Sequence, residues 1–342
     1  MLDSVPQSSL PSRIRAIAVG YPELIAVLAA AIVGLTVQRP LAWLAAHQGI
    51  NVLLAILVFA TAVTIDPAAL RRLASAWRAL AVALVVGITM LPALSWAVSR
   101  IVAAGSLRDG VLVVGLAPCE IASVATTAMA GGEAAISVGV LIGSTVATVA
   151  LAGPVLTLEA GHAGVSPASI IANLALVVAL PLAVGLAARA CAEVPVRLLT
   201  ATRVLATPRA ERIASWTSLA VVAALVALIA AEVHLSTAYL AVAAALFLFL
   251  LGSAVVGHFL GTRAARPTAA ALLLTTSMRD FAIAAGLAAA AFGPAAAAPL
   301  GLYGIAVLSV TSKQCAGTRP ARSQLFRRQR TVLQLPLRDG YL

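Results

Sequence analysis

Ala117-Pro118-Cys119-Glu120-Ile121-Ala122-Ser123 places a proline and a carboxylate in the middle of an apolar segment. A second interruption of the same kind follows at Thr275-Thr276-Ser277-Met278-Arg279-Asp280. If both segments cross a membrane, each helix must break near the bilayer centre. A broken backbone is tolerated at that depth only where it lines a protected cavity. The two stretches therefore predict a site at which two broken helices meet.

The composition identifies an integral membrane protein. Apolar residues make up 62% of the chain and charged residues only 10%, whereas about a quarter of a soluble domain is charged. Runs such as Ser218–Ala231 are apolar on every face. They favour an all-α protein over a β-barrel, whose strands alternate polar and apolar residues. We therefore expect a polytopic helical protein in a lipid bilayer.

Charge and cysteine usage exclude several other classes. The formal charge of +11 is typical of basic cytoplasmic loops in a membrane protein, so we expect no nucleic-acid partner. Cys119, Cys191 and Cys315 have no paired spacing, so neither a disulfide framework nor a metal site is expected. The sequence shows neither a nucleophile–base pair nor a metal motif of the kind that would suggest an enzyme. No cofactor is expected.

Counting apolar runs predicts about ten transmembrane helices, since each span needs about 20 residues. They lie near 22–38, 50–65, 77–98, 109–129, 134–158, 168–188, 213–231, 237–260, 268–291 and 295–311. We expect three regions: a cytoplasmic segment 1–20, a transporter domain 21–311 and a basic, disordered cytoplasmic tail 312–342. The short piece Pro40–His47 is expected to lie at the membrane interface.

The basic residues predict the orientation in the cell membrane. Arginines gather at the N-terminus, in alternate loops and in the tail, whereas the opposite side holds only Arg39, Arg100 and Arg108. Positive charge accumulates in cytoplasmic loops, so both termini are predicted to be cytoplasmic. The domain is expected to consist of two repeats, at about 21–160 and 166–311. With five spans in each, the second repeat is inverted relative to the first.

Three charges fall well inside predicted spans, away from the span ends, and all three lie in the two interruptions: Glu120, Arg279 and Asp280. A charge at the bilayer centre costs at least about 2.5–3.5 kcal/mol. These residues therefore indicate either a polar transport pocket or an ion pair of Arg279 with one of the carboxylates. Hydroxyl groups cluster around them and are further candidates for substrate or ion binding, unless they bond their own helix backbone: Ser123, Thr126, Thr127, Ser137, Thr275, Thr276 and Ser277.

The chain resembles the bile acid:sodium symporter family. Pro118 followed by Ala122-Ser123 fits that family's P-x-x-x-A-S-N pattern in a broken fourth helix. The turn from Gly131 to Val138 fits its G-G-D/E-x-A-L-S-V pattern, and Ser144-Thr145 and Phe292-Gly293-Pro294 fit later motifs. The resemblance covers roughly residues 20–310. It implies a panel group and a core group of helices, with the broken fourth and ninth helices crossing in the core, and Pro118 breaking the fourth.

Departures from the family pattern concern the ion site. Where the family holds sodium with side-chain oxygens, this chain has Gly87, Val124, Thr275, Arg279 and Asp280. A hard cation needs several convergent oxygens, and a guanidinium supplies none. Sodium coupling is therefore doubtful. Proton coupling through Glu120 or Asp280 is the alternative.

Two classes of function follow. The first is a secondary transporter of a small organic anion, whose acidic group would meet the positive ends of the half-helices and Arg279. Within this class stands an arsenite-type efflux permease of the same superfamily, since that branch carries an A-P-C segment like Ala117-Pro118-Cys119. The second is a non-transporting membrane sensor on the same fold.

Overall fold

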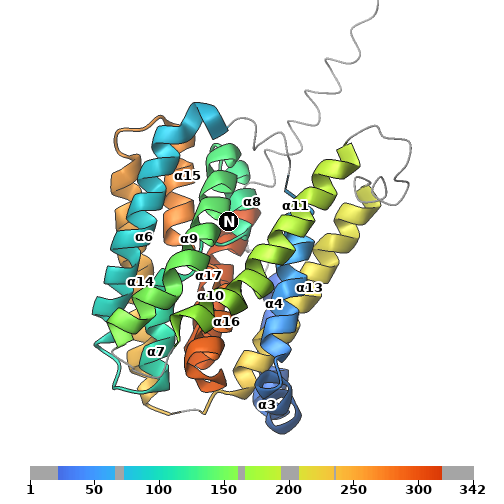
Figure 1. Ribbon diagram of the computed structural model, residues 1–342, viewed down its shortest axis with the longest axis vertical. Helices are drawn as coiled ribbons and strands as arrows, with labels where there is room; N and C mark the ends of the chain where they lie inside the picture. The colour runs from blue at the N-terminus through green and yellow to red at the C-terminus, as the bar shows by residue number, and fades with distance from the viewer. Residues whose placement is uncertain (1–21, 66–72, 161–165, 194–207, 235, 318–342) are drawn as a thin grey trace, which may run out of the picture.

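The computed structural model describes residues 22–65, 73–160, 166–193, 208–234 and 236–317 (Figure 1). These residues form helices and no strands. The main helices are α2 (Pro22–Thr36), α3 (Gln38–Ala46), α4 (Gly49–Ala62), α6 (Trp77–Ser99), α7 (Ser106–Val113), α8 (Ala122–Met129), α9 (Ala134–Ala160), α10 (Pro167–Leu174), α11 (Leu180–Glu193), α13 (Pro208–Ala231), α14 (Ala238–Gly261), α15 (Arg266–Ser277), α16 (Phe281–Phe292) and α17 (Ala298–Gly317). Short 3₁₀ turns lie at η1 (Leu73–Ala76), η2 (Val114–Leu116) and η4 (Pro294–Ala297), and a π turn, η3 (Ala175–Ala179), joins α10 to α11.

The prediction of an all-helical membrane protein is confirmed for the described part of the chain. Four helices there are long and apolar enough to cross a membrane unaided: Trp77–Ser99, Ala134–Leu158, Pro167–Cys191 and Ala238–Gly261. The bent pair α2–α3 makes a fifth if it counts as one span. Length and composition thus support a multi-pass membrane protein, while the number ten stays a prediction.

Two details of the predicted boundaries are refined. The piece near Pro40–His47 is helix α3, which turns by 98° from the axis of α2. The last helix, α17, continues to Gly317 rather than stopping at 311. Several basic residues that set the predicted orientation lie outside the described residues, among them those of the segment 1–21 and the tail 318–342.

The helices form two groups. We call α2, α4, α11 and α13 the panel, because α13 packs against both α2 and α4, and α4 packs against α11. Helices α6 to α9 and α14 to α17 form the core. Within it, α6 packs against α7, α9 and α14, and α15 packs against α14. In Figure 1 the panel helices lie on the right and most of the core lies on the left, with α16 between them in contact with α4. The observed grouping is the one that the resemblance implied.

Close backbone packing holds the first broken segment against α6. At Gly115 in η2, an added Cβ would lie 2.2 Å from Ser95 Oγ and 2.3 Å from the carbonyl oxygen of Leu91. Ser95 Oγ also donates a hydrogen bond to the carbonyl oxygen of Leu112 at 2.9 Å. Interiors are packed as densely as crystals, so only glycine fits here. This contact sets the position of the residues that follow it, Ala117 to Glu120.

Gly115→Ala should therefore destabilise the protein by about 1–3 kcal/mol, because the new methyl group meets a backbone oxygen that cannot move aside. Thermal unfolding of the purified protein in detergent measures the effect. Gly301→Ala is the control, since its Cβ would meet only the Ile229 side chain, at 3.1 Å. An equal loss of stability in both variants would contradict the role assigned to Gly115.

Candidate functional site

The two broken helices cross and bond to each other through their backbones. The first break lies between η2, which ends at Leu116, and α8, and the second lies between α15 and α16. The Glu120 N–H donates to the Met278 carbonyl at 2.9 Å, and the Asp280 N–H donates to the Pro118 carbonyl at 2.9 Å. These bonds make an isolated antiparallel bridge centred on Cys119 and Arg279. Each break thus supplies hydrogen-bond partners to the other.

Different residues cause the two breaks. In the first, Pro118 has no N–H to donate and holds the preceding residue, Ala117, in an extended conformation with φ −63° and ψ 147°. The second break contains no proline. There Met278 ends α15 in an extended conformation, and Asp280 starts α16 as its N-cap. The break is shorter than predicted, because Thr275 and Thr276 still belong to α15.

The bridge separates the charges. Successive side chains of an extended segment point to opposite sides, so Cys119 and Arg279 project to one face of the crossing. Pro118, Glu120 and Asp280 project to the other. The expected ion pair of Arg279 with a carboxylate is not formed among the described residues, and neither Arg279 Nε nor Glu120 Oε2 has a hydrogen-bond partner there. The ion-pair alternative is therefore wrong for Glu120 and Arg279, because the alternation of the extended backbone turns the two side chains apart.

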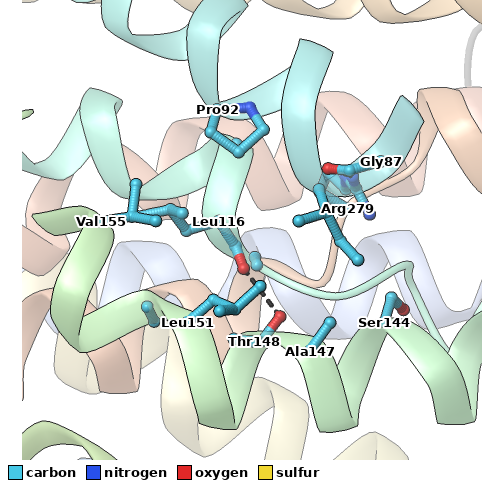
Figure 2. A pocket seen from close by; sticks show the side chains of 13 residues that line it. Gly87, Pro92, Leu116, Ser144, Ala147, Thr148, Leu151, Val155 and Arg279 are labelled. Carbon is cyan, nitrogen blue, oxygen red and sulfur yellow. Dashed lines mark hydrogen bonds between the residues drawn. The ribbon is translucent and has the colours of Figure 1, made fainter. Parts of the chain in front are cut away.

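Arg279 is buried in the core, with only 2% of its surface exposed. Its Nη2 donates to the carbonyl oxygen of Gly87 in α6 at 3.0 Å, and its backbone N–H donates to Tyr303 Oη in α17 at 3.1 Å. A Cβ at Gly87 would lie 3.3 Å from Nη2, so glycine leaves room for the guanidinium. Figure 2 shows Arg279 beside Gly87. Two of the positions at which the sequence departs from the symporter pattern, Gly87 and Arg279, thus contact each other.

The two carboxylates lie at the starts of the second half-helices. Asp280 Oδ1 accepts hydrogen bonds from the N–H groups of Ala282 and Ile283, both at 2.9 Å, and so caps α16. The Glu120 carboxylate lies beside the backbone N–H groups of Ala122 and Phe281 and interacts electrostatically with Asp280. Helix N-termini carry partial positive charge that stabilises carboxylates. The positive ends expected to meet a substrate are therefore already next to the protein's own acids.

The predicted hydroxyl groups divide into two sets. Thr126 and Thr275 each donate to the carbonyl four residues earlier, in α8 and α15. Such bonds are ordinary within helices. Ser137 Oγ instead donates to Thr127 Oγ1 at 2.9 Å, which joins α9 to α8, and Ser123 Oγ lies 3.8 Å from Cys119 Sγ. These two hydroxyls thus connect parts of the core, and their contact with an ion or substrate stays a prediction.

Three polar residues at the crossing were not predicted as site residues. Ser144 Oγ accepts the Cys119 N–H at 3.1 Å, and Thr148 Oγ1 donates to the Leu116 carbonyl at 2.8 Å. Tyr303 is fully buried and holds the second break. The spacing of Ser137, Ser144 and Thr148 places them on one helix face, and this periodicity was the available signal. No comparable signal marks Tyr303.

A hollow lies on each side of the crossing. The first, which we call the α6–α9 cleft, has about 330 Å³ of empty space, part of it open to the outside of the protein, and reaches Arg279, Gly87, Ser144 and Thr148. The second, which we call the panel–core crevice, has about 270 Å³. It lies between α4 and α11 on the panel side and α9 and α16 on the core side, and it includes Ile121 and Ile283. These two residues lie at the starts of α8 and α16.

Comparison with known proteins agrees with these features. A model of the Sodium Bile acid symporter family matches residues 51–240, more than half of the chain. The matched region includes the first broken helix and the residues from Gly131 to Thr145 that carried the resemblance. No curated protein matches the chain.

Asp280→Ala should destabilise the protein by about 1 kcal/mol or more, because the α16 N-terminus loses its cap. Asp280→Asn should keep most of the stability, since an amide oxygen also accepts the two N–H bonds. Thermal unfolding midpoints of the three proteins in one detergent measure both effects. If Asn is as damaging as Ala, then Asp280 is needed for its charge and not for its capping bonds.

Proposed function

Because the chain belongs to the Sodium Bile acid symporter family, a family of membrane transporters and not of enzymes, we propose that it is a secondary active transporter of a small organic anion. Its ten proposed spans form two inverted repeats of five. The order of elements supports this arrangement, since α6, the broken pair α7–α8 and α9 correspond to α14, the broken pair α15–α16 and α17. The antiparallel bridge also brings the two breaks together in opposite directions.

The proposed substrate site is the panel–core crevice beside the crossing. The crevice touches Ile121 and Ile283 at the starts of α8 and α16, where helix dipoles favour an anion. Its other lining residues are largely apolar, among them Val58, Leu141 and Leu182. An organic anion with an apolar body matches this combination.

The unpartnered Glu120 Oε2 is the observation that carries the proposed coupling. Glu120 lies on the face opposite Arg279, so no cation neutralises it there. A proton on Glu120 removes one negative charge from the half-helix ends that receive the substrate. Binding of the proton and binding of the anion then favour each other, as symport requires. Sodium has no evident role at Arg279, where the guanidinium already occupies the space next to the Gly87 carbonyl.

Uptake by proteoliposomes tests the proposal with a panel of labelled organic anions. An inward proton gradient should drive accumulation with or without sodium, and one pH unit supports up to about tenfold accumulation, or 1.4 kcal/mol. Glu120→Gln should reduce the gradient-driven accumulation to the equilibrium level. Glu133→Gln is the matched control, because Glu133 bonds Thr268 outside the crossing. Accumulation that needs sodium, or that survives Glu120→Gln, would refute proton coupling at this residue.

The same vesicles distinguish the alternative functions. The thiol that carries the resemblance to the arsenite-type branch, Cys119, is fully buried beside Arg279, which does not favour arsenite efflux. Arsenite movement that Cys119→Ser abolishes would nevertheless establish that function in place of anion uptake. If no anion and no arsenite moves under either gradient, then the sensor hypothesis replaces the transporter.

Chemical labelling of Cys191 tests the proposed orientation, in which both termini are cytoplasmic. This residue is exposed at the end of α11, whereas Cys119 is buried. With Cys315 replaced by serine, a membrane-impermeant maleimide should label Cys191 only after intact spheroplasts are permeabilised. Adding Cys191→Ser should abolish the labelling. Labelling of Cys191 from outside the intact cell would reverse the orientation.

A further inference from the structure

Arg279 is the only buried basic side chain in the described part of the protein. Its guanidinium makes one side-chain hydrogen bond, to the neutral Gly87 carbonyl, and its buried Nε makes none. A buried charge without a partner costs several kcal/mol, and buried donors are almost always bonded. Among the described residues, no negative group pairs with Arg279 to offset this cost.

The nearby acids do not supply it. Asp280 directs Oδ1 to the α16 N-terminus, and the bridge turns both Asp280 and Glu120 away from the face of Arg279. The groups that do lie on or beside this face are neutral donors and acceptors. Ser144 Oγ binds the Cys119 N–H, and Tyr303 Oη binds the Arg279 N–H. The positive charge is thus uncompensated by any side chain of the described core.

The guanidinium borders the α6–α9 cleft (Figure 2). On α9 the lining residues recur every three or four positions from Ser144 to Val155, so one helix face lines the cleft for about 16 Å. The end near Arg279 is polar, with Ser144 and Thr148, and the other end is apolar, with Leu151 and Val155. In Figure 2 the polar and apolar ends lie on opposite sides of the view. The cleft thus presents one cation and the Ser144 hydroxyl to whatever enters it, since the Thr148 hydroxyl already donates to the Leu116 carbonyl.

We propose that the polar end of the α6–α9 cleft binds a small monovalent anion, a halide or a short carboxylate, as the counter-ion of Arg279. One guanidinium balances one negative charge, so a dianion would bring a second, uncompensated charge into apolar surroundings. Arg279 Nε supplies the free donor. The Ser144 hydroxyl donates only a long bond, 3.2 Å, to the Leu141 carbonyl, so it can turn toward the ion at little cost.

This site is separate from the proposed substrate crevice, which lies on the other side of the crossing. The ion neutralises a charge inside the core and holds the second break against α6, whether or not the protein transports. Its test is therefore equilibrium stability, and failure of the ion site leaves the transport proposal standing.

Thermal unfolding of the detergent-purified protein in a series of sodium salts at one ionic strength gives the first test. Chloride, bromide and acetate should each raise the midpoint by roughly 2–4 °C relative to gluconate and sulfate, since gluconate is too large and sulfate too highly charged. The larger of the bromide and acetate shifts shows whether the site prefers a halide or a short carboxylate. Exchanging sodium for potassium should change nothing. A midpoint that follows the cation, or that is equal in all anions, overturns the proposal.

Substitutions at Arg279 and Ser144 test whether the effect of the anion on the unfolding midpoint arises at this site. Arg279→Gln should abolish the difference between chloride and gluconate, and Arg279→Lys should retain part of it because the charge remains. Arg100→Gln is the matched control, since Arg100 is exposed at the end of α6, and it should respond like the native protein. If Arg279→Gln does not fold, Ser144→Ala decides, because loss of its hydroxyl should at least halve the shift. A full shift in Ser144→Ala, or in a folded Arg279→Gln, refutes the site.

Discussion

The structure depends on one constraint: two helices stop inside an apolar molecule, and the freed backbone groups must find partners there. The crossing meets it with two backbone bonds, Glu120 to Met278 and Asp280 to Pro118. Neighbouring side chains satisfy the outward-facing N–H groups, since Ser144 accepts from Cys119 and Tyr303 accepts from Arg279. Unsatisfied groups would cost several kcal/mol each in hydrocarbon. Core helices α9 and α17 are therefore part of the crossing as much as the broken helices are.

The same bridge organises the electrostatics. Because extended residues alternate in direction, one positive and two negative side chains on the two bridged segments project to opposite faces. Arg279 enters the core between α6 and α9, while Glu120 and Asp280 lie at the starts of α8 and α16. An ion pair would have cancelled these charges within the protein. Their separation instead leaves one positive side chain on one side of the crossing and two negative side chains on the other.

Much of the fold could be predicted from the sequence. Apolar runs give the helices, because a chain in a bilayer must bury its backbone groups within each span, and every predicted run contains a helix or a broken pair. Proline marks the first break. Charged residues mark the second break, but its predicted limits are too wide. Thr275 remains helical, and only the capping bonds of Asp280 define where α16 starts.

The candidate site was less predictable. Glu120, Arg279 and Asp280 stood out because buried charge is rare, yet their mutual arrangement follows from the register of a bridge between residues far apart in the chain. That register has no local signal. Tyr303 was missed for the same reason, since its role comes from the place where α17 packs and not from its neighbours in the sequence.

The bridge uses only main-chain atoms at its centre, and this frees the side chains of the crossing. No side-chain atom of Cys119, Glu120, Met278 or Arg279 takes part in the two bonds between the breaks. The backbone of these residues therefore builds the crossing, whereas their side chains determine which ions it can bind. Substitution of these side chains can change the charge at the crossing without rebuilding it, so a family match says more about how the chain folds than about which ion it binds.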